Sequence, residues 1–289
     1  MSTKTKSFFN PSTITSGFVA VLVGYATSAI IVYQAAMAAQ ATNEQAVSWL
    51  MVLGLGMGLS SIALSLYLKM PIFTAWSTPG AALLVTSLSG VSLNQAVGVF
   101  MFSSLLMLLC GLTRVFERFT QYIPMSLANA LLAGVLFQFG LNVFLSLESQ
   151  LLLGGVMLLS FFILRVLTPL YTIPLVLLIG CTIAYAVGSF DLSYVQLELT
   201  GPVWITPEFD LMTCLSIGLP LFVITMASQN MPGVAVLQAH GYNPPVSKLI
   251  NTTGFTGVVL APFGGFAFNL SAITAAICMS DSTGKNDIK

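Results

Sequence analysis

The sequence predicts an all-α polytopic membrane protein with about ten transmembrane spans, and its composition, segment lengths and charge placement all support this class. Hydrophobic residues make up 56% of the 289 residues, charged residues make up 6%, and the mean hydropathy is +0.94. A soluble domain carries about 25% charged residues. Because so few charges cannot cover a water-facing surface, most of the surface is expected to face lipid.

Charge-free runs define the spans, because a helix that crosses the hydrocarbon core needs about 20 apolar residues. The run between Lys69 and Arg114 is too long for one span, and Gly90 with its polar neighbours divides it. In chain order the predicted spans are residues 15–38, 46–68, 71–88, 93–112, 124–145, 149–167, 171–188, 209–230, 246–262 and 266–280.

Charge placement predicts the orientation of these spans. All nine Lys and Arg residues fall on the same side as the N-terminus. Positive residues resist translocation, so this side is predicted to be the cytoplasm of a multi-pass protein in the bacterial inner membrane. The other side receives only acidic charges, and residues 189–208 are expected to form an ordered periplasmic loop. The first apolar run has full span length and is expected to be retained, not removed as a signal peptide.

Several function classes find no support in the sequence. It shows no Walker motif, no nucleophile paired with a base and no basic nucleic-acid patch, so we expect no enzyme activity, cofactor or nucleic-acid partner. The four cysteines lack metal-ligand spacing, so no metal site is predicted. Gly54, Gly56 and Gly58 are expected to serve close helix packing, and His240 is expected at the cytoplasmic interface.

The third predicted span cannot be a continuous helix, because Pro79-Gly80 stands near its middle. Proline removes a backbone donor and clashes with the preceding turn, and glycine loosens the chain. We therefore predict an extended segment up to about Trp76, followed by a half-helix. Ser77 or Thr78 would cap this half-helix, and Pro79 would occupy its first turn.

The tenth predicted span repeats this plan. Pro262 and a glycine pair precede Asn269, which is expected to cap an Ala-rich half-helix. Aligned from Pro71 and Pro262, Gly80-Ala81 falls opposite Ser271-Ala272. Two interrupted spans at corresponding positions of inverted halves are the typical sequence sign of a transporter binding site. The alternative is that Pro79 and Pro262 only kink ordinary helices.

Non-helical backbone at membrane depth occurs only where it is buried in protein or lines a cavity. Two half-helix N-termini that meet near the midplane would present free N–H groups and partial positive charge. The two broken spans therefore predict a site for an anion.

Four segments carry a resemblance to a known family. These are Thr74–Leu84 (TAWSTPGAALL), Thr225–Ala235 (TMASQNMPGVA), Ala261–Gly265 (APFGG) and Ala272–Cys278 (AITAAIC). They strongly resemble the benzoate/proton symporter family, and the collinear similarity begins as early as Gly24-Tyr25-Ala26 in the first span. The resemblance implies uptake of benzoate or a related aromatic carboxylate together with protons.

The resemblance also implies a fold similar to the uracil-type and sulfate-type transporters, with two inverted repeats of about seven spans each. The predicted organisation has four parts: a first repeat at residues 1–188 (spans 1–4 core, spans 5–7 gate), the periplasmic loop at 189–208, a partial second repeat at 209–280, and a cytoplasmic tail at 281–289. The second repeat stops about four spans short of the family pattern. A truncated gene, a partial sequence or a partner that supplies the rest would explain this, and a homodimer is compatible with the fold.

The candidate binding residues cluster at the two breaks and in the eighth span. Amides in an apolar span usually face the protein interior, so Gln229 and Asn230 are expected to bond substrate, bond the freed backbone, or pack between helices. Aromatic side chains near the breaks would form a wall for a benzene ring or serve packing. The full set of candidates is Tyr25, Phe73, Ser77, Thr78, Pro79, Gly80, Ala81, Gln229, Asn230, Phe266, Asn269, Leu270, Ser271 and Ala272.

The sequence is also compatible with three alternatives to a benzoate transporter. The same half-helices suit a passive anion channel, a carrier of sulfate or a nucleobase, or a non-transporting remnant. No Asp, Glu, Lys or Arg stands near the middle of a predicted span, so the expected proton coupling rests on the resemblance alone.

Overall fold

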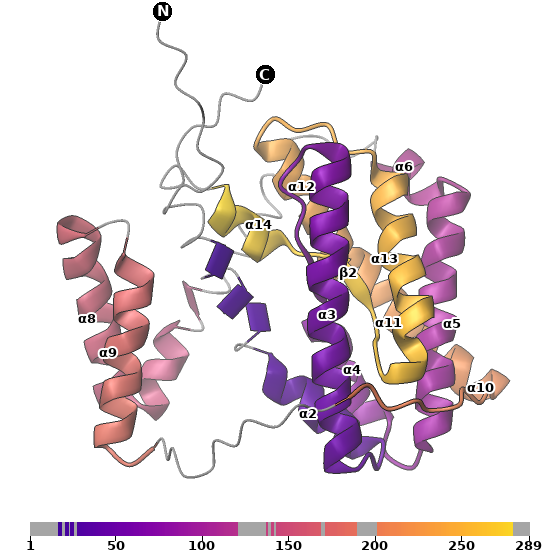
Figure 1. The fold of residues 1–289 in the computed structure, drawn as a ribbon, viewed down its shortest axis with the longest axis horizontal. Coiled ribbons are helices and arrows are strands. Elements are labelled where there is room, and N and C mark those ends of the chain that lie inside the picture. The colour runs from indigo at the N-terminus through magenta and orange to yellow at the C-terminus, as the bar shows by residue number, and fades with distance from the viewer. Residues whose placement is uncertain are drawn as a thin grey trace, which may run out of the picture. The chain divides into compact units, whose positions relative to one another are not determined.

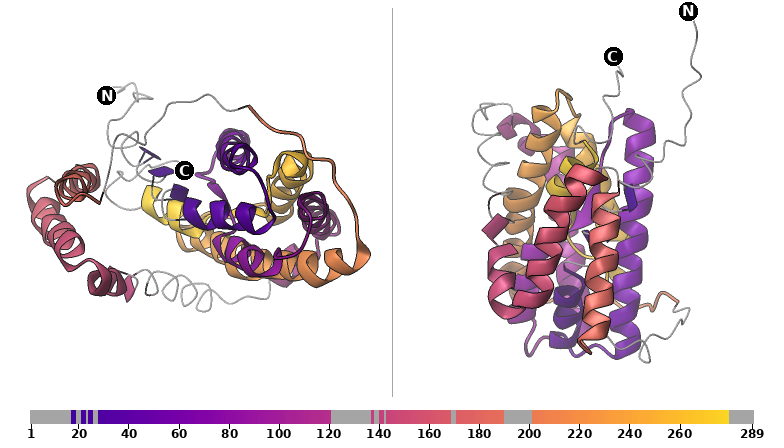
Figure 2. Two further views of the ribbon diagram at one scale, coloured as in Figure 1. Left: turned by 90° about the horizontal axis from the view of Figure 1, so that it is seen from below. Right: turned by 90° about the vertical axis from the view of Figure 1, so that its left-hand side faces the viewer.

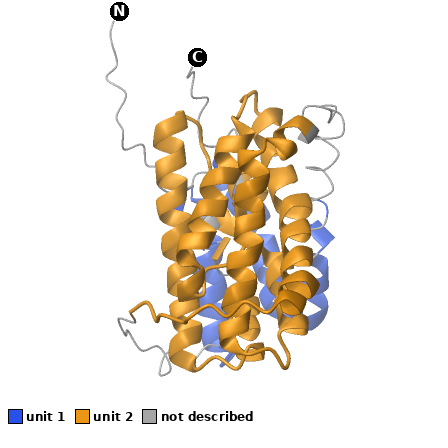
Figure 3. Ribbon diagram, turned by 90° about the vertical axis from the view of Figure 1, so that its right-hand side faces the viewer, with its two compact units in different colours: residues 1–22, 133–198, 277–289 blue, residues 23–132, 199–276 orange. Residues whose placement is uncertain are grey.

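The computed structural model describes residues 17–18, 21–22, 24–25, 28–120, 137, 140–141, 143–168, 171–189 and 201–279. The chain divides into two compact units, one of residues 23–132 and 199–276 and the other of residues 1–22, 133–198 and 277–289 (Figure 3). Most of the predicted span 124–145, the first part of the predicted loop 189–208 and the tail 281–289 lie outside the described residues.

Within its described residues, the larger unit contains three helices that are long and apolar enough to cross a membrane: α3 (Asn43–Leu68), α5 (Leu93–Leu112) and a composite helix over Leu211–Ala239. α3 and α5 each begin with a capping box, formed by Thr42 with Gln45 and by Ser92 with Gln95. These caps satisfy the free N–H groups of the first turn, which fixes where each helix begins. The expected membrane class is thus supported by apolar helices of membrane-spanning length.

The composite helix differs from the predicted eighth span, which ended at residue 230. It runs to Ala239 through α10 (Leu211–Thr213), the π-helical η2 (Cys214–Gly218), α11 (Leu219–Thr225), the π-helical η3 (Met226–Asn230) and α12 (Met231–Ala239). Each π-helical turn is followed within two residues by a proline, Pro220 or Pro232. A wider turn shifts the carbonyl that a proline ring would otherwise hit, so the helix continues where the sequence predicted an end.

The two predicted broken spans each contain a strand followed by a short helix. β1 (Thr74–Trp76) precedes α4 (Thr78–Ser87), and β2 (Phe268–Leu270) precedes α14 (Ala272–Cys278). The strands pair antiparallel in a two-stranded sheet. Figure 1 shows β2 between α3 and α13 (Val246–Leu260), and Figure 2 shows that the long helices α3, α5 and α13 run roughly parallel. This confirms the predicted strand-plus-half-helix geometry of both segments.

Other described elements of the larger unit lie outside the strands and the long helices. They are α2 (Ala29–Ala38), α6 (Val115–Thr120) and the 3-10 turn η4 (Ala261–Phe263). The described part of the predicted external loop is tied to the helices beside it: Val203 N donates to Ser48 Oγ at 2.9 Å and Glu208 N donates to the Asn94 carbonyl at 3.0 Å.

Small residues bring the helices close to the sheet. A Cβ on Gly56 of α3 would lie 2.6 Å from the Phe268 ring of β2, and a Cβ on Gly257 of α13 would lie 2.4 Å from Ser104 Oγ of α5. A Cβ on Gly54 would lie 3.2 Å from the Tyr25 ring, whereas Gly58 has open space around it. The expected packing role is therefore confirmed for Gly54 and Gly56, since side chains at these positions would displace their neighbours.

The smaller unit contains the helix pair α8 (Leu151–Leu167) and α9 (Thr172–Ala186). α8 is strongly apolar but buries none of its described residues. Apolar side chains in contact with lipid need no protein partner, so this exposure agrees with a membrane environment.

Candidate functional site

The crossing of the two broken spans is the centre of the candidate site. Ala75 stands opposite Asn269 in the strand register, with Thr74 opposite Leu270 and Trp76 opposite Phe268. Beyond the strands the same ladder continues, because Ser77 N donates to the Ala267 carbonyl at 3.1 Å and Ser271 N donates to the Phe73 carbonyl at 2.8 Å. We call β1, β2 and the first turns of α4 and α14 the crossing.

Ser77 caps α4, as the sequence predicted. Its Oγ accepts from Gly80 N at 3.1 Å, its carbonyl accepts from Ala81 N at 2.8 Å, and Pro79 stands in the first turn. Ser77, Gly80 and Ala81 are buried, whereas Thr78 and Pro79 are half-buried. The cap fixes the point at which the extended segment becomes helix.

Removing this cap is expected to destabilise the protein moderately. Ser77→Ala leaves the Gly80 N–H without its acceptor, which should lower the free energy of unfolding by about 1 kcal/mol. Thermal unfolding in detergent would measure the loss, with Ser87→Ala at the far end of α4 as the control. An unchanged melting temperature for Ser77→Ala would contradict the capping role.

Asn269 does not cap the second half-helix, so that expectation was wrong. Asn269 lies inside β2, and Ser271 precedes α14, where its Oγ accepts from Thr274 N at 3.4 Å. Ser271 is therefore the structural equivalent of Ser77. The alignment from the two prolines had instead placed Ser271 opposite Gly80, which lies three residues after Ser77. The alignment failed because the loop after Pro262 contains a 3-10 turn that the segment after Pro71 lacks.

Side chains from the helices satisfy the outer edges of the sheet. Thr74 N donates to Ser61 Oγ of α3 at 2.9 Å, and Leu270 N donates to Asn230 Oδ1 of η3 at 2.9 Å. Apolar surroundings offer no hydrogen bonds to open strand edges, so these partners allow the strands to lie inside an apolar helix bundle. Of the roles expected for Asn230, the structure shows the bond to freed backbone, while the neighbouring Gln229 is half-buried.

One face of the crossing carries an unsatisfied acceptor. Because side chains alternate along a strand, Ala75 and Asn269 share one face, opposite to Thr74 and Leu270. Asn269 is fully buried, and its Nδ2 donates to the Ala267 carbonyl at 3.1 Å. Its Oδ1 has no hydrogen-bond partner among the described residues. Such an atom at membrane depth costs about 1–3 kcal/mol unless a ligand or water supplies a donor.

The aromatic candidates take different positions. Phe73 is half-buried beside the crossing, whereas Phe266 is fully buried in an aromatic cluster with Trp49 and Phe100, at ring-centroid distances of 6.3 and 5.1 Å. Tyr25 packs edge-on against Trp76 at 5.0 Å, and its hydroxyl donates to the Leu50 carbonyl at 3.0 Å. Packing thus accounts for Phe266, whereas Tyr25 and Phe73 are both half-buried.

Sequence reasoning missed Ser61 and the capping role of Ser271. Both are hydroxyl residues in otherwise apolar segments, and Ser271 directly precedes the Ala-rich helix. The usable signal was that serine caps a helix as well as asparagine does. No local signal shows which strand a hydroxyl on α3 will meet.

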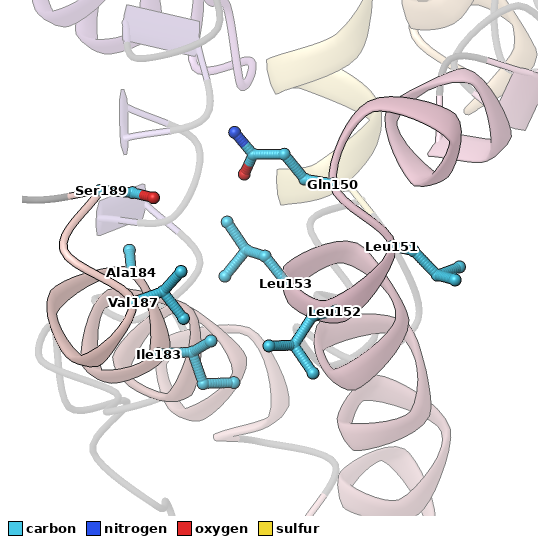
Figure 4. Close-up of a pocket in the computed structure, with 8 residues that line it drawn as sticks. All are labelled: Gln150, Leu151, Leu152, Leu153, Ile183, Ala184, Val187 and Ser189. Atoms are coloured by element: carbon cyan, nitrogen blue, oxygen red, sulfur yellow. The ribbon is translucent and has the colours of Figure 1, made fainter.

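A cavity of about 250 Å³ lies in the smaller unit, between α8 and α9 (Figure 4). Its lining is mostly apolar and carries no charged side chain; it consists of Gln150, Leu151, Leu152, Leu153, Ile183, Ala184, Val187 and Ser189. Nothing in this lining would recognise a carboxylate specifically. Within the described residues, no group of three or more His, Cys, Asp and Glu could hold a metal ion.

Comparison with known proteins agrees with the membrane character of the fold. The family model described as "Benzoate membrane transport protein" matches residues 7–289. The chain is 48% identical over 270 residues to "Inner membrane protein YdcO" of Escherichia coli (strain K12), covering 93% of this chain and 69% of that protein. It is 35% identical over 274 residues to "Benzoate membrane transport protein" of Acinetobacter baylyi, covering 95% of this chain and 70% of that protein. The chain is therefore a membrane protein that belongs to the benzoate membrane transport protein family.

Proposed function

We propose that this protein is a secondary transporter that imports benzoate or a related aromatic carboxylate together with protons, by alternating access. The observation that carries the proposal is the crossing. It brings the N-terminus of α4 and Asn269 Oδ1, which lacks a partner among the described residues, to paired strands inside an apolar helix bundle. Family membership supports the substrate class, since one relative is named as a benzoate transport protein.

The substrate carboxyl group would lie beside the first turn of α4. Ser77 already occupies the Gly80 and Ala81 N–H groups, so attraction comes mainly from the partial positive charge at the helix N-terminus. Thr78 and Pro79 line this end and are half-buried, and Phe73 offers an aromatic face to the ring. The proposed site thus has a polar end for the carboxyl group and an apolar end for the ring of an aromatic acid.

The proton would travel on the substrate or on an associated water. Asn269 Oδ1 can only accept a hydrogen bond, and the Nδ2 of the same amide donates to the Ala267 carbonyl. A carboxylate can only accept, so Asn269 Oδ1 needs either a protonated carboxyl group or a water as its donor. The predicted spans have no charged residue near their middles to take that proton instead.

The transport architecture belongs to the same proposal. We infer a core of spans 1–4 and 8–10, a gate that includes spans 5–7, inverted repeats, and a cytoplasmic N-terminus. Two features support it: the larger unit contains residues 23–132 and 199–276, and the crossing has a local two-fold pattern in which Ser77 and Ser271 play equivalent roles. The nine basic residues on one predicted side support the orientation.

Substitution of Asn269 tests the proposed site. Asn269→Leu removes the free acceptor and should raise the Kd for labelled benzoate about tenfold, which corresponds to about 1.4 kcal/mol. Membrane insertion and yield should be unchanged. Thr256→Val in α13, whose hydroxyl bonds the Thr252 carbonyl at 2.8 Å, is the control and should bind as wild type.

The binding assay itself uses purified protein, with sulfate and uracil as competitors. Saturable binding that only aromatic acids displace would support the proposed substrate class. Displacement by sulfate or uracil would show a different substrate, and flux that never saturates would show a channel. Wild-type affinity in Asn269→Leu would contradict the placement of the site.

A further inference from the structure

The hydroxyl of Thr225 is the starting point of a further inference. Thr225 is the last residue of α11, at the entry to the π-helical turn η3, and it is fully buried. Its Oγ1 has no hydrogen-bond partner among the described residues. Sequence reasoning gave this residue no role beyond its place in a family-like segment.

Other hydroxyls in the described helices show how unusual this is. Ser60 Oγ donates to the Gly56 carbonyl at 2.6 Å, Ser228 Oγ donates to Ile224 at 2.7 Å, and Thr256 Oγ1 donates to Thr252 at 2.8 Å. A bond to the preceding turn is the usual solution for a helical hydroxyl without another partner. Thr225 does not use it, although leaving a buried hydroxyl unpaired costs about 1–3 kcal/mol.

Neighbouring contacts locate Thr225 beside the crossing. One turn before it, Leu221 lies so close to α4 that a Cβ on Gly80 would be 2.8 Å from Leu221 Cδ1. After it, Asn230 bonds Leu270 N at 2.9 Å, and a Cβ on Gly233 would be 2.5 Å from Leu270 Cβ. The composite helix thus runs along the crossing from the first turn of α4 to β2, and Thr225 lies between these contacts.

Ser103 and Ser104 of α5 also lack hydrogen-bond partners among the described residues. Ser104 lies against Gly257 in the interface with α13, where a small residue serves helix packing. Thr225 differs because the composite helix that carries it packs against the crossing, where Asn269 Oδ1 also lacks a partner among the described residues. A polar ligand or a bound water beside the crossing would satisfy such oxygens, whereas apolar packing would not.

We propose that Thr225 is a further binding residue of the transport site, and that its hydroxyl donates a hydrogen bond to the substrate carboxyl group. This inference rests on the proposed transport function. A hydroxyl is able to donate and accept, so it serves either protonation state of the carboxyl group. The donor stays unpaired until substrate arrives, so substrate gains its bond without breaking another.

If Thr225 binds substrate, removing its hydroxyl should weaken binding without lowering stability. A hydroxyl with a purely structural role would lower stability and binding together. Thr225→Val keeps the shape of the side chain and removes the hydroxyl. Because the hydroxyl has no partner among the described residues, its removal should leave the melting temperature unchanged or raise it. The Kd for benzoate should nevertheless rise about five- to tenfold, which is the effect of one lost hydrogen bond.

The experiment measures Kd for labelled benzoate and melting temperature on four purified proteins: wild type, Thr225→Val, Thr225→Ser and Thr256→Val. Thr225→Ser keeps a hydroxyl and should bind within about twofold of wild type, as should Thr256→Val. Wild-type affinity in Thr225→Val would overturn the inference, and so would a lower melting temperature with parallel loss of binding, which marks a structural hydroxyl. If wild type fails to bind benzoate, the proposed function falls together with this inference, whereas an unaffected Thr225→Val overturns this inference alone.

Discussion

Replacing Gly264 with alanine is expected to lower the free energy of unfolding by about 3 kcal/mol or more, among the largest effects of any single methyl group in this protein. Gly264 has φ +88, a conformation that costs other residues about 1–2 kcal/mol. A Cβ there would also lie 1.7 Å from Trp49 Cδ1. Overpacking of this kind typically costs a further 1–3 kcal/mol, about as much as the strain itself.

The surroundings of Gly264 leave little room for relief. Trp49 is fully buried, and its ring lies 5.1 Å from Phe100 and 6.3 Å from Phe266. Gly264 itself closes the 3-10 turn that leads into β2, because its N–H donates to the Ala261 carbonyl at 2.9 Å. Displacing either partner would move β2, so benzoate binding should fall together with stability.

Alanine substitutions at two other glycines measure the cost of backbone strain separately from the cost of the clash with Trp49. Gly241 has φ +82 and no atom within 4 Å of a built Cβ, so Gly241→Ala should cost only about 1–2 kcal/mol. Gly58 lies in α3 with open space, and Gly58→Ala should be neutral or stabilising by up to about 1 kcal/mol. Thermal unfolding followed by size-exclusion chromatography would rank the variants. A Gly264→Ala protein no less stable than Gly241→Ala would show that Trp49 does not constrain the turn.

Asn230→Leu is expected to have the second large effect, on both stability and binding. It removes the acceptor of the Leu270 N–H at a fully buried position, which should cost about 1–3 kcal/mol. Because β2 carries Asn269, the Kd for benzoate should also rise about tenfold or more.

Conservative and distant variants sharpen this test. Asn230→Asp keeps an oxygen that can accept from Leu270 and should retain more stability than Asn230→Leu. Gln238→Leu removes an amide from the same composite helix, in α12, and should change neither stability nor binding. If Asn230→Leu melted and bound like wild type, the bond to Leu270 would not hold the strand. Thr225→Val should differ from Asn230→Leu by weakening binding alone.

Much of the fold was predictable because its signals are local. The span at residues 93–112 coincides with α5, and the first turn of α4 has the predicted cap and proline. Apolar run length, capping residues and proline positions act over a few residues, so they can be read without knowing the neighbours. The fold of β1 followed by α4 was predictable for the same reason.

The exceptions depended on distant parts of the chain. The composite helix continues past Asn230 because π-helical turns accommodate its prolines, and the sequence gives no sign of these turns. Phe266 packs against Trp49 and Phe100, which come from two other helices. The strand register set Ser271 as the cap in place of Asn269.

The sequence by itself determined the membrane class, the positions of the breaks and the family, because these follow from hydropathy, local backbone chemistry and extended similarity. Only the tertiary structure decided which polar atoms are satisfied. Asn230 and Leu270 are 40 residues apart, and their bond exists because the composite helix runs beside β2. The same arrangement left Thr225 Oγ1 and Asn269 Oδ1 without partners among the described residues, because hydrogen-bond satisfaction in an apolar bundle depends on what each side chain meets in space.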